Sequence, residues 1–231
     1  MYEVAEKMKG DIIMKKLEIS GGSASKNSVE LYLRRKYTGV KAIQRDDGRV
    51  DTEEVSVAET LKNMHTLVRI LIVFGFLREI VIVLNLPKFL YHIATALFIL
   101  ILLMALLVVS VGETRQYHGA EHKVANWFKK DREKMEHEDI KKCSRIHMKC
   151  GTNLISTIVT FYLISSIYFS ITGNQIPEIF TARLPWFLYS VFPFNILGLL
   201  AQLISTKEPD DKHLKVAAVA LITLISKYKE E

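Results

Sequence analysis

Residues 93–111 read IATALFILILLMALLVVSV, nineteen consecutive residues without a charge. An α-helix of about 20 apolar residues is long enough to cross the hydrocarbon core of a bilayer. Two further apolar runs without a charge follow, at residues 153–172 and 186–206. A soluble helical core rarely contains three such runs. The sequence therefore predicts a mainly α-helical, polytopic membrane protein.

A fourth apolar run, at residues 66–84, is interrupted by Arg69 and by the pair Arg78-Glu79. Charged side chains are costly in lipid and should face protein, water or head groups. This run is therefore either a membrane span or a re-entrant or interfacial helix. We expect about four transmembrane or membrane-embedded helices, with spans near residues 66–84, 92–111, 153–172 and 186–206.

Lysine and arginine are unevenly distributed between the segments that flank these runs. Residues 1–62 contain 12 of them, residues 112–152 contain 10 and residues 205–231 contain 5, whereas each intervening loop has one. With four spans, the basic segments lie on one side. The positive-inside rule then puts both termini and the central loop in the cytoplasm of a multi-pass cell-membrane protein. No basic and aromatic motif accompanies the net charge of +6, so no nucleic acid is expected as a partner.

The N-terminal segment has the pattern of a small sheet. Apolar and polar residues alternate over residues 29–33, as they do in a strand with one buried face. Asp46-Asp47-Gly48 lies between two runs of this kind and is typical of a hairpin turn. We therefore expect a β-rich cytoplasmic domain over about residues 17–55, with Gly21-Gly22-Ser23 in a turn.

The predicted domain boundary lies after residue 62, and residues 63–231 form the membrane domain. Its cytoplasmic loop spans residues 112–152, and the charged stretch at residues 124–142 within the loop predicts a solvated helix. Residues 212–229 alternate lysine with apolar residues. This pattern predicts a C-terminal helix that lies at the membrane interface or packs on the domain.

The central loop begins with Tyr117-His118-Gly119-Ala120-Glu121-His122-Lys123, and the helix of span 92–111 is expected to continue into it. On a helix, His118 and His122 share one face. Two imidazoles at this spacing can bind one metal ion, and Glu121 can take a proton from a water molecule. The order H-x-x-E-H is that of the inverzincins. The alternative is an amphipathic helix with two surface histidines.

His147 and Cys150 lie directly before span 153–172, and both residue types can bind zinc. Spans 92–111 and 153–172 form a hairpin, so their loop ends should lie at the same membrane face as His118 and His122. His147 and Cys150 are therefore candidate ligands. A buried free cysteine is the simpler explanation for Cys150.

Three carboxylates, Glu208, Asp210 and Asp211, surround Pro209 just after the last span. On the predicted topology this turn lies at the same membrane face. Its carboxylates could add an oxygen ligand or orient a ligand histidine. The alternative is a helix stop followed by a carboxylate that caps the C-terminal helix.

The three segments YHGAEHK, SRIHMKCGT and TKEPDD, in this order and between these spans, resemble those of the YqhQ-like family of bacterial and archaeal membrane proteins. The resemblance runs from about Leu17 to the C-terminus. It implies a predicted metal-dependent enzyme of unknown substrate whose motif positions are His118, Glu121, His122, His147, Cys150, Glu208, Asp210 and Asp211. The chain departs from the family pattern at Asn27 and Ser28, where the family tends to have Glu and Gly, and at Glu79, where it tends to have Gly.

Two functions follow from these residues. The first is a zinc-dependent hydrolase at the cytoplasmic membrane face, with Glu121 as general base and a protein or lipid as substrate. The second is a non-enzymatic scaffold or assembly factor in which His118, His122, His147 and Cys150 close a structural zinc site. A transporter ranks below both unless the chain forms an oligomer. The metal, the substrate and the oligomeric state are left open.

Overall fold

The computed structural model describes residues 19–33, 38–56, 84, 87–130, 137–148, 150–172 and 196–230. The chain divides into two compact units. Unit 1 comprises Met1–Lys62, Ser110–His147 and Thr206–Glu231, and unit 2 comprises Asn63–Val109 and Met148–Ser205. The division does not follow a single cut after residue 62, because the central loop and the C-terminal helix belong to the same unit as the N-terminal sheet. Each unit is described by itself.

Unit 1 contains a four-stranded antiparallel sheet in which each strand pairs with the next along the chain. The predicted β-rich segment is thereby confirmed. The predicted hairpin is confirmed as well, and Gly48 in its turn has a φ of 81°, a value that glycine adopts without steric cost. The strands are β1 (Ile19–Ala24), β2 (Ser28–Leu33), β3 (Thr38–Gln44) and β4 (Val50–Ser56).

The prediction of a turn at Gly21-Gly22-Ser23 was wrong, because these residues lie within β1. Glycine was read as a turn signal, but here it pairs with β2, with a register shift between Ile19 and Gly21. A glycine inside a strand often marks a place where another group approaches the backbone closely. That group is Glu121, as the site geometry below shows.

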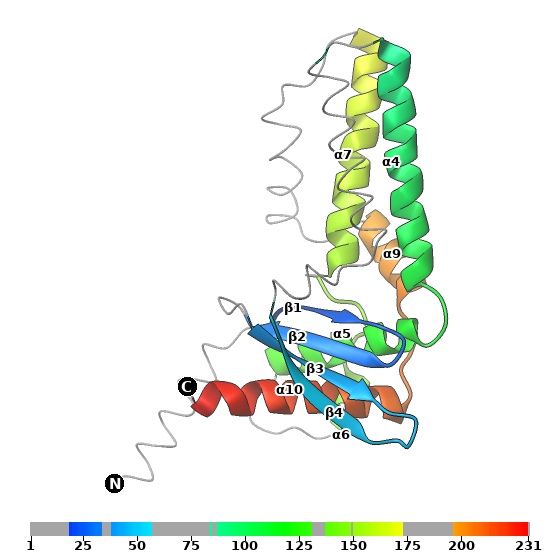
Figure 1. The fold of residues 1–231 in the computed structure, drawn as a ribbon. Helices are drawn as coiled ribbons and strands as arrows, with labels where there is room; N and C mark the ends of the chain where they lie inside the picture. The colour runs from blue at the N-terminus through cyan, green and yellow to red at the C-terminus, as the bar shows by residue number, and fades with distance from the viewer. Residues whose placement is uncertain are drawn as a thin grey trace. The chain divides into compact units, whose positions relative to one another are not determined.

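Helices cover one face of this sheet (Figure 1). Helix α5 (Thr114–Lys130) packs on β1 and β2, α10 (Asp211–Glu230) packs on β2, β3 and β4, and the short α6 (His137–Lys142) packs on α5. The C-terminal helix is therefore packed on its domain. Its apolar side and the inward residues of β2 and β3 form one core, which includes Val29, Leu31, Val40, Ala42, Leu214, Ala217 and Leu221.

Two helix predictions in the central loop need correction. The helix of the preceding span does not continue into the histidine motif: α4 ends at Val109 and α5 begins at Thr114. Gly112 between them has a φ of 64°, the left-handed conformation that ends many helices. The stretch at 124–142 is not uniformly solvated either, because Val124, Trp127 and Phe128 are buried in the core.

Unit 2 consists of helices in its described part: α4 (Lys88–Val109), α7 (Gly151–Thr172) and α9 (Ile196–Ser205). Among the described residues, α7 is the one helix whose length and composition allow it to cross a membrane, and Phe89–Met104 and Ile196–Ser205 are shorter apolar helices. The mainly helical fold class is confirmed, and the count of four spans stays a prediction. The predicted span 66–84, apart from Leu84, and residues 186–195 of the fourth span lie outside the described residues.

The described helices of unit 2 bury several polar side chains together with aromatic ones, and expose many large apolar side chains. Thr152, Asn153, Ser156, Thr157 and Ser165 of α7 are buried. Nε2 of Gln202 on α9 donates to Oδ1 of Asn153 over 2.8 Å. Large apolar residues of the same helices are exposed, including Leu163, Ile164, Ile167, Ile171, Leu200 and Leu203.

Candidate metal centre

Helix α5 brings His118 and His122 together, as the four-residue spacing predicts. Their ring centroids are 4.4 Å apart, and the rings are inclined at 64°. Two imidazoles that share a tetrahedral zinc ion have centroids about 5 Å apart, because each Zn–N bond is about 2.0 Å long. The pair is therefore placed as ligands of one ion would be.

The imidazole of His122 is almost completely buried, and its Nδ1 lies 2.6 Å from the carbonyl oxygen of Arg145. A carbonyl can only accept, so Nδ1 carries the proton and Nε2 keeps its lone pair. Burial, and after it the charge of His118, holds the pKa of His122 well below its usual value. The ring is thus neutral, which is the form that binds a metal.

His147 belongs to unit 1 as well, and its ring centroid lies 5.6 Å from that of His122, with 44° between the rings. The segment that carries His147 is fixed to α5 by Asn126, whose Nδ2 donates to the carbonyls of Ser144 and Ile146, each over 2.8 Å. Together with the contact at Arg145, these bonds hold residues 144–147 along α5. Three imidazoles therefore gather in unit 1.

Cys150 lies in unit 2, where its thiol is buried and 3.1 Å from Oγ1 of Thr152. Among the described residues, His118, His122 and Cys150 form a group that could bind a metal ion, and His147 is not a member of that group. Three residues of chain extend over at most about 11 Å, so Cys150 cannot lie far from His147. The metal and its occupancy stay predictions.

Glu121 is buried on the side of α5 that faces the sheet. A Cβ atom at Gly22 would lie 2.5 Å from the backbone oxygen of Glu30 and 2.6 Å from Oε1 of Glu121, so a glycine in β1 leaves room for both groups. Burial first, and then the charge of Glu30, raises the pKa of Glu121 to about 8. Without a cation nearby, the group is therefore a neutral carboxylic acid at pH 7.

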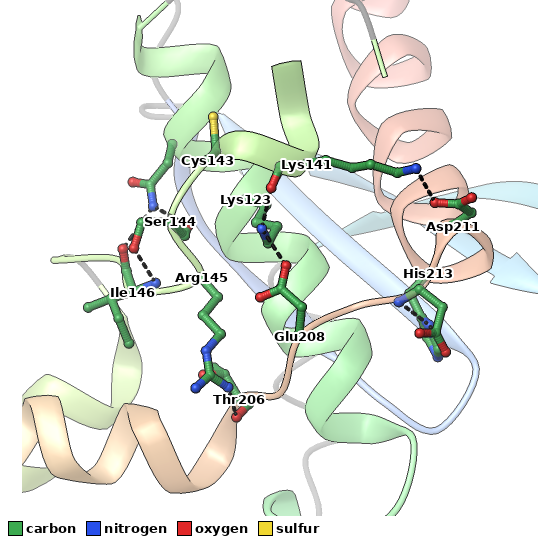
Figure 2. Close-up of polar contacts among 12 residues, drawn as sticks. Lys123, Lys141, Cys143, Ser144, Arg145, Ile146, Thr206, Glu208, Asp211 and His213 are labelled. Atoms are coloured by element: carbon green, nitrogen blue, oxygen red, sulfur yellow. Dashed lines mark hydrogen bonds and ion pairs between the residues drawn. The ribbon is translucent and has the colours of Figure 1, made fainter. Parts of the chain in front are cut away.

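The three carboxylates of the acidic turn make their described contacts with side chains other than the histidine pair. Oε1 of Glu208 is 2.7 Å from Nζ of Lys123, and Oδ1 of Asp211 is 2.8 Å from Nζ of Lys141 (Figure 2). Oδ2 of Asp210 accepts from Nε2 of Gln116 over 3.0 Å. These contacts tie the turn to α5 and α6. Their predicted role as ligands or ligand supports stays a prediction.

Asp210 also begins α10, and its carbonyl accepts from the backbone N–H groups of His213 and Leu214. The backbone N–H of Asp210 donates to Nδ1 of His213 over 3.2 Å. This bond is one half of a capping box, with histidine in the place of the usual Glu or Gln, while the carboxylate of Asp210 accepts from Gln116. His213 is completely buried, and its ring packs edge-on against Tyr117. The turn thus ends directly before the C-terminal helix, and capping of that helix by a carboxylate stays a prediction.

Lys123 was not singled out in the sequence, yet it joins three parts of unit 1. Its side chain is only 5% exposed, and its ammonium contacts Glu208 and donates to the carbonyl of Lys141 over 2.5 Å (Figure 2). Gly119, one turn earlier on α5, is equally constrained, because a Cβ there would lie 2.2 Å from the carbonyl oxygen of Lys207. The ion pair of Lys123 with Glu208 and the close approach of Lys207 to Gly119 have no sequence signal, since each joins segments more than eighty residues apart.

A family model described as "Protein of unknown function (DUF1385)" matches residues 28–192. The match covers most of the chain and includes His118, Glu121, His122, His147 and Cys150. No curated protein and no solved structure matches the chain. The predicted resemblance to an uncharacterised family is thereby supported, while the YqhQ-like name and the description as metal-dependent enzymes stay predictions.

Proposed function

Given that the chain belongs to this DUF1385 family of proteins of unknown function, we propose that it is a metal-dependent membrane hydrolase. His118, His122 and Cys150 are its metal ligands, and Glu121 is its general base. The metal is zinc or an ion with similar preferences, because two imidazoles and a thiolate suit zinc. The substrate is a protein or a lipid at the membrane.

One observation carries this proposal: the hydrogen bond from Nδ1 of His122 to the carbonyl of Arg145. Metal-binding histidines almost always donate their second ring nitrogen to a carbonyl or carboxylate, which fixes the tautomer and orients the ring. His122 has this arrangement, with the neighbouring imidazole of His118 at 4.4 Å. A surface histidine needs no such support, and His122 is only 1% exposed.

The buried carboxyl group of Glu121 supports a catalytic rather than a purely structural role. Burying it without a cation is unfavourable, as its raised pKa of about 8 records. Structures keep such groups mainly where chemistry needs them. A bound zinc ion would supply Lewis-acid activation of water and favour the ionised form of nearby acids. Glu121 would then accept the proton of the attacking water and pass it to the leaving group.

Membrane residence is supported by unit 2. Helix α7 is long and apolar enough to cross a bilayer, and its exposed residues are mostly apolar. The distribution of lysine and arginine favours a multi-pass chain with both termini and the central loop in the cytoplasm. The proposed site would then act on substrates at the cytoplasmic face.

The test compares the wild-type chain with Glu121→Gln, both reconstituted in proteoliposomes. Metal content per chain is measured together with the hydrolysis of a panel of lipid esters and membrane peptides. We expect Glu121→Gln to retain its metal and to lose at least about 100-fold in turnover, since general bases contribute about 10²- to 10⁴-fold. The matched control is Glu113→Gln, at an exposed carboxylate that pairs with Lys212. Equal turnover in wild type and Glu121→Gln would overturn the assignment of the base.

The second candidate is a closed structural zinc site in a scaffold or assembly factor. It is favoured by the proximity of His147, whose ring is 5.6 Å from that of His122. Three imidazoles and one thiolate would complete a tetrahedral shell and leave no position for water. X-ray absorption on the zinc-loaded chain separates the two functions. Three protein ligands and one exchangeable oxygen support the hydrolase, whereas a full N₃S set supports the scaffold.

A further inference from the structure

Some of the basic side chains on α5, α6 and α10 are paired with carboxylates. Lys123 pairs with Glu208, Lys141 with Asp211 and Lys212 with Glu113. Three others differ, because Arg115, Arg145 and Lys207 have no carboxylate partner among the described residues. We call these three residues the basic cluster. Its charges are available for an external anion.

Backbone contacts within unit 1 bring the basic cluster together. The N–H of Lys207 donates to the carbonyl of Arg115 over 2.9 Å. Nη1 of Arg145 donates to the carbonyl of Thr206 over 2.7 Å (Figure 2). Both arginines therefore contact the same two-residue stretch, although the three cationic residues come from distant parts of the sequence.

A second, independent observation concerns the guanidinium group of Arg115. Its Nε is buried and has no hydrogen-bond partner among the described residues. A buried guanidinium N–H without an acceptor is costly, and native structures rarely keep one. An oxyanion such as a phosphate is the acceptor that a guanidinium binds best, because the two groups match in geometry and charge.

The places of these residues in the chain indicate where the anion lies. The chain passes between unit 1 and unit 2 at three described points, next to Ser110, His147 and Thr206. Each residue of the basic cluster is within five residues of one of these points. If the apolar helices of unit 2 lie in a bilayer, chain connectivity alone keeps all three cations near the head groups.

We infer that the basic cluster of Arg115, Arg145 and Lys207 binds the phosphate head group of an anionic phospholipid. The inference rests on the membrane residence proposed above but not on the metal. The cytoplasmic leaflet is the anionic one, and it attracts each nearby basic side chain. Arg145 would also link the lipid to the candidate centre, because its own carbonyl accepts from His122.

The test measures lipid binding to the purified full-length chain in detergent by native mass spectrometry. Phosphatidylglycerol and phosphatidylcholine with the same acyl chains are titrated separately. We expect wild type to prefer phosphatidylglycerol by about tenfold or more, since each basic residue near a membrane surface contributes about 1 kcal/mol. The triple variant Arg115→Gln, Arg145→Gln and Lys207→Gln should lose this preference.

The matched control is the triple variant Lys26→Gln, Lys129→Gln and Lys215→Gln. It removes three exposed lysines outside the basic cluster and changes the net charge equally. It should keep the lipid preference. Should the first variant not fold, Arg115→Gln and Lys207→Gln are combined with Arg145→Lys, which keeps a donor for the Thr206 carbonyl. That variant should still weaken the preference.

Several outcomes would overturn the inference. Wild type without a preference for phosphatidylglycerol, or a control variant that loses the preference equally, would show that the basic cluster is not a lipid site. Displacement of the lipid by millimolar inorganic phosphate would assign the cluster to a soluble phosphate instead. Release of the chain from membranes by alkaline carbonate would overturn membrane residence itself, a failure that is distinct from the loss of lipid preference.

Discussion

Units 1 and 2 bury different kinds of side chain. Unit 1 has an apolar core between its sheet and helices, with Val29, Leu31, Leu214 and Leu221 at its centre. The described helices of unit 2 bury serine, threonine, asparagine and glutamine beside aromatic residues such as Phe98, Phe161 and Phe169, and expose leucine and isoleucine. The first arrangement is stable in water. The second is typical of helices in lipid, where small and polar residues line helix contacts and apolar ones face the acyl chains.

The buried ionisable groups of the candidate site, His122 and Glu121, lie in unit 1. Unit 1 has enough apolar core to bury His122 and Glu121. Burial lowers the pKa of His122 and raises the pKa of Glu121, so it favours the neutral form of both groups. The polar groups of unit 2 pair with one another, as Asn153 and Gln202 do. The buried ionisable groups of the candidate site therefore lie in the unit with the larger apolar core.

The largest effect is expected from removing a proposed ligand histidine in unit 1. His122→Ala should weaken zinc binding by at least about 100-fold, because even residues that support ligands contribute about 10- to 100-fold. Metal per chain after purification and equilibration with buffered zinc measures the effect. The control is His92→Ala in unit 2, whose Nδ1 lies 3.2 Å from Oγ of Ser166. Equal losses in both variants would remove the distinction between the units.

A pH dependence should follow from the buried carboxyl group of Glu121. Its folded pKa of about 8 is above the ordinary value of 4.5, so the metal-free folded state binds more protons than the unfolded state between these values. Stability should therefore fall as the pH rises from 4.5 to 8, by at most about 1.4 kcal/mol for each pH unit. Below pH 4.5 this effect is absent.

Thermal unfolding of the metal-free chain at several pH values measures this loss of stability. Glu121→Gln should lose less stability between pH 5 and pH 9 than wild type, because glutamine does not ionise. Zinc should reverse the dependence in wild type, since a nearby cation stabilises the carboxylate. Identical pH profiles for wild type and Glu121→Gln would show that this carboxyl group is ionised in the folded protein throughout this pH range, and that its pKa is not raised.

Replacing one glycine in each unit by alanine should change stability by different amounts. Gly119→Ala should destabilise unit 1 by about 1–3 kcal/mol, the usual cost of overpacking. Its Cβ would meet the backbone oxygen of Lys207, and the gain in helix propensity of about 1 kcal/mol would not offset that clash. Gly151→Ala in unit 2 has no neighbour within 4 Å and should change stability by less than about 0.5 kcal/mol. Chemical denaturation of both variants measures the difference.

The smallest effect concerns the polar pair of unit 2. Gln202→Met keeps the size of the side chain but removes the donor to Asn153, and should cost about 0.6–1.7 kcal/mol, as hydrogen bonds between membrane helices do. Unfolding in mixed detergent micelles measures the change. Ser170→Ala, which removes an exposed bond within one helix turn, is the control with an expected change near zero. A loss at Ser170 as large as at Gln202 would contradict the buried polar contact.

Much of the fold was predictable because local patterns dominate it. The hairpin at Gly48, the helix with His118 and His122, and the apolar helices α4 and α7 each depend on neighbouring residues in the chain. The buried half of the charged stretch could also have been found. Val124, Trp127 and Phe128 are spaced as one helix face, although charged residues follow them directly.

The rest depends on contacts between distant segments, which no local pattern encodes. Gly22 was read as a turn residue, but its lack of a side chain makes room for Glu121, ninety-nine residues later. The acidic turn was weighed as a set of ligands, yet its carboxylates contact Lys123, Lys141 and Gln116. His213 was missed because a histidine in a capping box lacks the usual Glu or Gln signature.

The discontinuity of unit 1 has a consequence for how the protein is made. The sheet leaves the ribosome before the described helices of unit 2, whereas α10, which covers β2, β3 and β4, is synthesised after them. The inward face of the sheet is therefore exposed while unit 2 is being produced, and exposed apolar strands of this kind are prone to aggregation. Unit 1 becomes complete only after α10 has been synthesised. A nascent chain thus holds the histidine pair, but not its finished surroundings, until the C-terminal helix has docked.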